Sequence, residues 1–234
     1  MTFKKGIALA AVLVVVALVG VFTGSIPAAS QGPAKIDGQI AAGEYQYQCV
    51  VDISKVTAGA TFKMSFSWTI DKEFIYVGMQ APATGWVGWG LMNGTPGKVI
   101  MQGSDLIIGY VKDGQVFIED TYGDTIFSHK PDTALTYKDK GGQEHFGVRD
   151  IVEAAGTEDT AGTTIEFKRK LYTGDFFDLP VPVRGEVYVA YSDVDDFGTV
   201  HKGKGEGRSH RLINLMTGES STTAPDWTCG PAPK

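Results

Sequence analysis

The chain has 234 residues, of which 43% are hydrophobic and 11% aromatic, and this is enough apolar material for one large domain with a full core. Its formal net charge is −6. An acidic chain without basic clusters disfavours nucleic acids and anionic membrane surfaces as partners.

Residues 1–30 differ in character from the rest of the chain. Two lysines precede an unbroken apolar run, Ile7 to Phe22, which is followed by the small residues Ala28-Ala29-Ser30. This order predicts a secretory signal peptide. The same run, taken as residues 7–23, also fits an uncleaved membrane tether, because about 17 apolar residues is the lower limit for crossing a bilayer. Either interpretation places the following domain outside the cytoplasm.

Strand-like segments follow one another along the rest of the chain. Phe62 to Ile70 (FKMSFSWTI) alternates strictly between apolar and polar residues, which predicts a half-buried β-strand. An Asp113-Gly114 pair predicts a tight hairpin turn between two of the later strands. Those later strands are expected at Phe74–Gln80, Gly85–Leu91, Asp105–Val111, Gln115–Asp120, Thr163–Leu171, Glu186–Ser192 and Arg211–Leu215.

These short strands, separated by Gly, Asp and Pro turns, predict an all-β fold, an antiparallel immunoglobulin-like β-sandwich over residues 31–216. Residues 122–162 are polar and poorly periodic, with a short helix expected at Val148–Ala155. Residues 217–234 are rich in Ser, Thr, Pro and Gly, so we expect an extended C-terminal tail.

The chain has two cysteines, Cys49 near the start of the domain and Cys229 in the tail. A lone pair of cysteines in an exported protein most often forms a disulfide, so we expect a bridge that ties the tail to the domain. The Cys-x-x-Cys-His motif of covalently attached heme is absent from the sequence.

Three blocks of sequence resemble the DOMON domain family, the β-sandwich module of extracellular cytochromes and of dopamine β-monooxygenase-like proteins. The first block is Gly85–Gly90 (GWVGWG). The second is Met101–Val111 (MQGSDLIIGYV), followed by Asp-Gly and later by Asp120 and Tyr122. The third is Val189–Ser192 (VAYS), followed by His201 and a glycine-rich run to Asn214. The resemblance covers residues 36 to 215.

In heme-binding members, the resemblance implies a non-covalent b-type heme with methionine and histidine as axial ligands. The matching positions are Met101 and His201. His210 fits the motif less well, and Lys202 and Lys204 stay open as alternatives for the second ligand. The aromatic residues expected in the pocket wall or the core are Trp86, Trp89, Tyr110, Phe66 and Trp68.

A thioether and a neutral imidazole both ligate low-spin heme iron, and the soft sulfur favours the ferrous state. With both axial positions filled, no position is left for O2. The resemblance therefore implies electron transfer with a redox partner protein in or outside the membrane. The alternative from a different class is a β-sandwich that binds a carbohydrate or another small ligand on its aromatic residues, without heme.

Other candidate sites are less specific. His129 and His145 are expected at the surface. Asp193, Asp195 and Asp196 are acids that suit Ca2+, but three acids in a short loop are typical of a solvated turn. The common hydrolase, nucleotide-binding and metalloprotease motifs are absent from the sequence, which favours a carrier or binding module over an enzyme.

Overall fold

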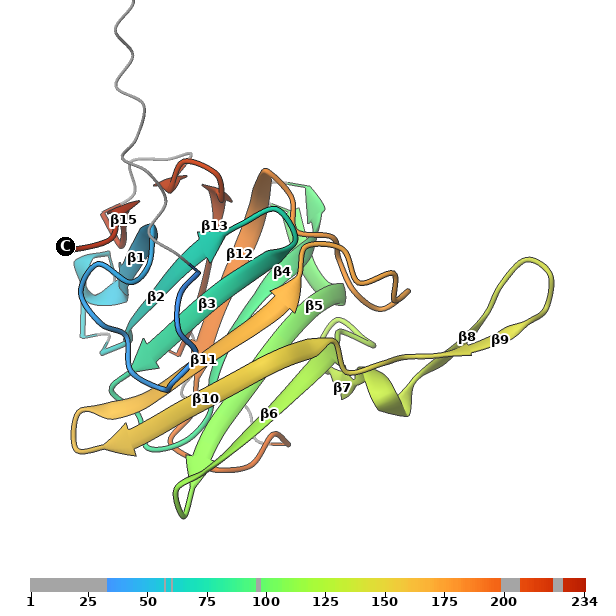
Figure 1. Cartoon of the computed structure of the whole chain (residues 1–234), viewed down its shortest axis with the longest axis horizontal. Helices are drawn as coiled ribbons and strands as arrows, with labels where there is room; N and C mark the ends of the chain where they lie inside the picture. Colours follow the sequence, from blue (N-terminus) through green and yellow to red (C-terminus); the bar gives the residue numbers. More distant parts are fainter. Residues whose placement is uncertain (1–32, 57, 60, 96–97, 199–206, 221–224) are drawn as a thin grey trace, which may run out of the picture. The chain divides into compact units, whose positions relative to one another are not determined.

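Two antiparallel β-sheets form the domain in the computed structural model, which describes residues 33–56, 58–59, 61–95, 98–198, 207–220 and 225–234 (Figure 1). The first sheet has the order β10-β11-β3-β2-β1-β15. Its strands are β1 (Tyr47–Asp52), β2 (Lys63–Ile70), β3 (Phe74–Ala81), β10 (Ile151–Asp159), β11 (Gly162–Lys170) and β15 (Trp227–Pro231).

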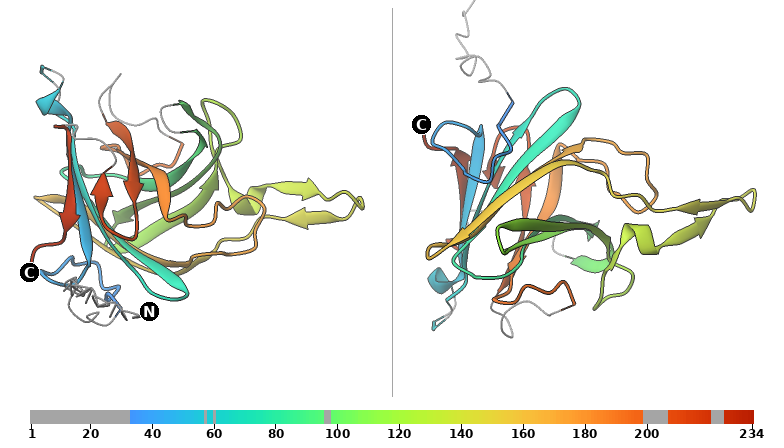
Figure 2. Two further views of the ribbon diagram at one scale, coloured as in Figure 1. Left: turned by 90° about the horizontal axis from the view of Figure 1, so that it is seen from above. Right: turned by 60° about the horizontal axis from the view of Figure 1, so that its bottom comes forward.

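The second sheet has the order β14-β13-β12-β4-β5-β6-β7. Its strands are β4 (Val87–Thr95), β5 (Lys98–Lys112), β6 (Gln115–Tyr122), β7 (Lys130–Pro131), β12 (Arg184–Tyr191), β13 (Arg208–Asn214) and β14 (Glu219–Ser220). Two 3-10 helices, η1 (Ile53–Lys55) and η2 (Asp132–Ala134), lie in connections. A separate hairpin, β8 (Thr136–Lys138) with β9 (Glu144–Phe146), extends away from both sheets (Figure 2).

The core lies between the two sheets and follows from the alternation of side chains along each strand. On β2 the predicted apolar face is buried, with Met64 and Trp68 each 1% exposed. These residues belong to one cluster with Trp89 of β4, Ile107 of β5 and Val189 of β12, which come from the opposite sheet. The prediction of an antiparallel β-sandwich is confirmed.

The turn between β5 and β6 also agrees with its sequence. Asp113 has φ 51° and Gly114 has φ 73°, so both central residues are left-handed, as in the tight hairpin turn that Asp-Gly favours. The strands on either side pair from Lys112↔Gln115 through to Asp105↔Tyr122.

The short helix predicted at Val148–Ala155 is wrong. Residues Ile151–Asp159 form β10, which pairs with β11 at the edge of the first sheet. Because an edge strand is partly exposed, its residues lack a regular apolar alternation; Val152 is 55% exposed. The pairing with β11 supplies its backbone hydrogen bonds, and this tertiary partner overrides the local preference.

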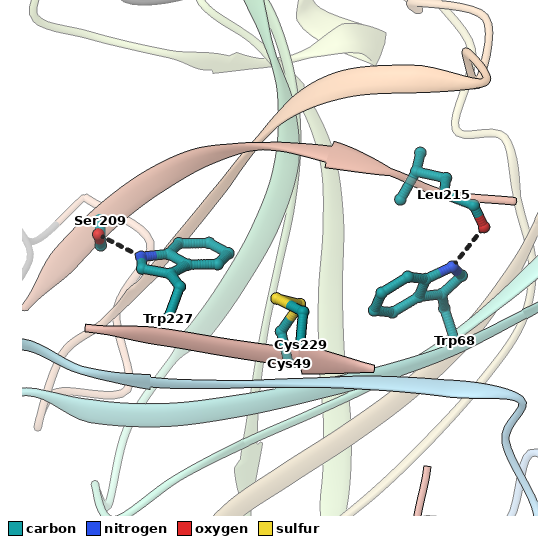
Figure 3. Close-up of a disulfide and its surroundings, with 6 residues drawn as sticks. All are labelled: Cys49, Trp68, Ser209, Leu215, Trp227 and Cys229. Carbon is teal, nitrogen blue, oxygen red and sulfur yellow. Dashed lines mark hydrogen bonds between the residues drawn. A yellow bond between two sulfur atoms is a disulfide. The ribbon is translucent and has the colours of Figure 1, made fainter. Parts of the chain in front are cut away.

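The C-terminal tail adds strands to the fold where an extended segment is expected. Strand β15 pairs with β1, and Cys49 lies opposite Cys229 in that pairing. The two residues form the predicted disulfide (Figure 3). The Trp227 indole donates a hydrogen bond to Ser209 Oγ of β13 at 2.9 Å, which connects the edges of the two sheets. The disulfide therefore holds the strand that closes one side of the sandwich.

The leader at residues 1–30 lies outside the described residues. Within the described part of the chain, no helix is long and apolar enough to cross a membrane.

Candidate cofactor site

The outward face of the second sheet is low and apolar at its centre. Along β4, Val87 and Trp89 point into the core, so Gly88 faces outward. Gly88 pairs with Ala190 of β12 on one side and with Ile108 of β5 on the other. The middle of this face therefore carries one hydrogen, one methyl group and one branched side chain, and this low surface is here called the floor.

Crowding does not explain the absence of a side chain at Gly88. A Cβ atom at this position would lie 3.5 Å from Ile108 Cγ1 and 3.6 Å from the Trp86 ring, which are ordinary van der Waals distances. Gly90, two residues along the same strand, differs: a Cβ there would lie 2.4 Å from the carbonyl oxygen of Asp105. Gly90 therefore permits close packing of β4 against β5, whereas Gly88 keeps the floor low.

A cavity of about 800 Å³ lies over this floor. Its volume is within the roughly 300–1,000 Å³ of pockets that hold cofactor-sized molecules. Trp86, Leu106 and Tyr188 line it and belong to an outward cluster that is separate from the core. Burial raises the pKa of Tyr188 to about 12, so its phenol is neutral. The cavity is thus mostly apolar and shaped by the sheet itself.

Met101 lines this cavity from the first half of β5. Its half-buried side chain packs against the outward cluster. The next residues of the motif fix the strand locally. Gly103 has φ 79°, a conformation that favours glycine. The buried Ser104 hydroxyl accepts a hydrogen bond from the main-chain N–H of Asn93 at 2.9 Å and donates one to the Ile100 carbonyl at 2.7 Å. The pairing of β4 with β5 shifts register between Leu91 and Asn93.

His129 also lines the cavity, which corrects its assignment to the surface. It ends the connection between β6 and β7, where the strongly exposed Phe127 also reaches the cavity. The Nδ1 atom of His129 is buried and has no hydrogen-bond partner. Burial lowers the pKa of this imidazole. A neutral ring with a free nitrogen suits a metal ligand.

His210 is a further histidine at the cavity, carried by β13. Its Nδ1 lies 2.8 Å from Glu186 Oε1. An ionised carboxylate can only accept, so Nδ1 carries the proton, and Nε2 is the ring nitrogen that could bind a metal when the ring is neutral. Metal-ligating histidines commonly show this orientation by a carboxylate. His145, in contrast, lies on β9, stacks on Tyr137 and does not line this cavity.

His201, Lys202 and Lys204 lie outside the described residues. The described residues on either side of that segment, Phe197, Gly198 and Arg208, line the cavity.

The three aromatic residues predicted for the site lie in different environments. Trp86 lines the cavity within the outward cluster. Trp89 borders the cavity but packs in the core against Phe167, with ring centroids 5.9 Å apart. Tyr110 stands behind the cavity wall, where its ring centroid is 4.8 Å from that of Phe197. Phe66 and Trp68 are core residues.

The family model of the DOMON domain matches residues 61–193. The chain belongs to the DOMON domain family. The match includes the GWVGWG and MQGSD blocks, which in this DOMON domain form the floor and one wall of the cavity.

Among solved structures, this DOMON domain is similar to the cytochrome domain of Myriococcum thermophilum cellobiose dehydrogenase. The identity is 11%, the TM-score is 0.47, and the match covers 74% of this chain and 84% of that one. It is also similar to the cytochrome b domain of Coprinopsis cinerea pyranose dehydrogenase, with 13% identity and a TM-score of 0.42, over 65% and 76% of the two chains. A comparison with curated protein sequences gives no match.

The residues around the cavity fit a flat, apolar, iron-containing group. The floor accepts a planar molecule because Gly88 and Ala190 project so little from the sheet. A thioether and two imidazoles border the same cavity, and one imidazole nitrogen is buried without a partner. Arg208 adds a positive charge for an acidic substituent.

Proposed function

We propose that this DOMON domain binds one non-covalent b-type heme over the floor and carries electrons outside the cytoplasm. One observation supports this most strongly: a thioether side chain and two imidazoles line a single cavity whose floor is low and apolar. These are the donor types of a low-spin electron-transfer heme.

Met101 would supply the sulfur ligand. His201 would supply the nitrogen ligand, because it occupies the histidine position of the family pattern. His210 is the alternative, since Glu186 contacts its Nδ1 and would orient the ring so that Nε2 could bind the iron. Trp86 and Tyr188 would contact the porphyrin, and Arg208 would pair with its carboxylates.

A bound heme supplies one-electron chemistry at its iron. With both axial positions filled by the chain, the domain would carry electrons and leave no open position for O2 or peroxide. The disulfide suits an oxidising compartment, and residues 1–30 would export or tether the domain. Its partner would be a redox protein in or outside the membrane.

Heme reconstitution with absorption spectroscopy tests the proposal. We expect a Soret band and a sharp reduced α-band in the wild type. Met101→Leu should lower the reduction potential and disturb the low-spin spectrum, because the thioether favours Fe(II). Met79→Leu is the matched control, since Met79 is fully buried in the core.

The second ligand is assigned by a parallel set of variants. His201→Ala should abolish the low-spin spectrum, whereas His145→Ala, which lies away from the cavity, should leave it unchanged. If His201→Ala is unaffected, the variants His210→Ala, His129→Ala, Lys202→Ala and Lys204→Ala identify the residue that replaces it. A wild type without any Soret band would reject heme and favour the carbohydrate or small-ligand alternative.

A further inference from the structure

A second group of potential ligands lies on the inner side of the second sheet, away from the floor. Asp105 of β5, Asp120 of β6 and Asp178, in the connection between β11 and β12, each place one carboxylate oxygen within 4.8 Å of the others. Asp105 and Asp120 are each 2% exposed. We call these three residues, together with Asp132 described below, the acid cluster.

One positive side chain is buried against the cluster. Arg169 of β11 is fully buried, and its Nη1 atom donates to the two carboxylate oxygens of Asp105 at 2.9 and 2.8 Å. Its Nη2 atom lies 3.5 Å from Asp178 Oδ2. This arginine pairs with Asp105, whereas Asp120 accepts a hydrogen bond from the main-chain N–H of Asp150 at 2.9 Å.

The fourth acid, Asp132 of η2, indicates that a positive charge is missing from the cluster. Asp132 is 1% exposed, and neither of its carboxylate oxygens has a hydrogen-bond partner. Asp120 Oδ1 is also buried without a partner. The carboxylate of Asp132 is within electrostatic reach of Asp120, Asp178 and Asp105, in that order of strength. Buried carboxylate oxygens are normally paired, so such unpaired oxygens indicate an absent proton or cation.

The charges of the cluster do not balance. Four carboxylates against one guanidinium leave −4 + 1 = −3 when all are ionised. The folded cluster therefore needs positive charge, and this comes from protons or from a metal ion.

We propose that the acid cluster is a Ca2+ site in which Asp120 and Asp178 are the main ligands, Asp105 completes the group while it stays paired with Arg169, and the buried carboxylate of Asp132 adds negative charge beside the ion. Carboxylate oxygens are the ligands that Ca2+ prefers, at about 2.3–2.6 Å. Two oxygens on one such ion lie at most about twice that distance apart, which agrees with the 4.8 Å spread. One divalent ion would reduce the net charge from −3 to −1.

The position of the cluster gives the ion a second effect. Asp120 precedes, and Asp132 follows, the connection whose Phe127 and His129 reach the cavity over the floor. Ca2+ would bind one end of this connection through Asp120 and attract the other end through the charge of Asp132. It would also bind four residues beyond Met101 on the same strand. The ion would therefore hold one wall of the cavity in place, although its binding does not depend on heme.

Calcium titration of the EDTA-treated full chain tests the site. Isothermal titration calorimetry should give about one Ca2+ per chain. At a free concentration about a hundred times Kd, the unfolding midpoint should rise by about 5–10 °C. Asp120→Asn and Asp178→Asn should each weaken Ca2+ binding at least tenfold. Asp196→Asn, in the exposed acidic loop, is the matched control and should bind Ca2+ as the wild type does.

If both cluster variants fail to fold, the titration of the wild type alone decides whether the site binds Ca2+. Absence of binding heat and of any midpoint shift up to about 10 mM Ca2+, beyond the range of extracellular calcium modules, would overturn the proposal and leave protons as the neutralising charge. Loss of Ca2+ binding in Asp196→Asn alone would overturn it in favour of the Asp193–Asp196 loop. None of these readouts uses heme, so a failure here is distinct from a failure of the heme proposal.

Discussion

Gly88 offers the sharpest separation of ligand binding from folding. Its Cβ position is open, with Ile108 and Trp86 at 3.5 and 3.6 Å, so Gly88→Ala should fold at least as well as the wild type. Replacing a glycine within a strand by alanine gains about 0.5–1 kcal/mol. The further carbons of Gly88→Leu would have to project into the cavity. Overpacking costs about 1–3 kcal/mol, and here this cost would weaken the binding of the ligand and not the folding of the chain.

That cost predicts a heme affinity that is roughly 5- to 150-fold weaker in Gly88→Leu, measured by titration of the Soret absorbance. Urea denaturation of heme-free Gly88→Leu should give the same free energy of unfolding as that of the heme-free wild type. Gly90→Ala is the contrasting variant: its Cβ would lie 2.4 Å from a carbonyl oxygen, so it should lose about 1–3 kcal/mol of stability. Tight heme binding by a well-folded Gly88→Leu would refute the placement of heme over the floor.

Three further predictions concern stability. Arg169→Met should lower the free energy of unfolding by about 3–5 kcal/mol, because it leaves Asp105 and Asp178 buried without their cation; a urea midpoint equal to that of the wild type would contradict this. Reduction of Cys49–Cys229 should cost about 2–5 kcal/mol while the heme spectrum is unchanged, since the bridge lies on the β1–β15 edge; equal denaturation curves with and without reductant would argue against it. In EDTA, raising the pH from about 5 to about 8 should lower the thermal midpoint, and Ca2+ should remove this dependence. The sign follows from Asp132, because burial and then the charges of Asp120, Asp178, Asp105 and Asp175 raise its pKa in the folded state to about 9. Asp132 therefore keeps its proton when the chain is folded and loses it on unfolding, so the stability falls as the pH rises. A midpoint that rises over this pH range would show that other groups dominate.

Much of the sandwich is predictable because its central strands alternate. The strict pattern of Phe62–Ile70 gives β2 its buried face, and Asp113-Gly114 gives the hairpin. The same parity separates the two tryptophans of GWVGWG. Trp86 and Trp89 are three residues apart and lie on opposite faces of the strand, one at the cavity and one in the core. The odd spacing of the two tryptophans could have predicted this separation from the sequence alone.

Other features depend on contacts that local sequence does not encode. Strand β10 forms because β11 pairs with it, although its residues read locally as a short helix. His129 reaches the cavity because the connection between β6 and β7 runs past the outward cluster. Asp105 and Asp120 belong to the family motif, yet their convergence with Asp178 requires the folded sandwich. The acidic loop at Asp193–Asp196 had the clearer sequence pattern for Ca2+, whereas among the described residues it is Asp105, Asp120 and Asp178 whose carboxylate oxygens converge within 4.8 Å.

The reduced absorption spectrum of the heme-reconstituted full chain, recorded beside that of its Met101→Leu variant, tests whether heme is held through Met101 and a histidine. We expect a sharp low-spin α-band in the wild type and in Met79→Leu, with loss or displacement of that band in Met101→Leu. A wild type that binds no heme, or a Met101→Leu spectrum identical to that of the wild type, would contradict it.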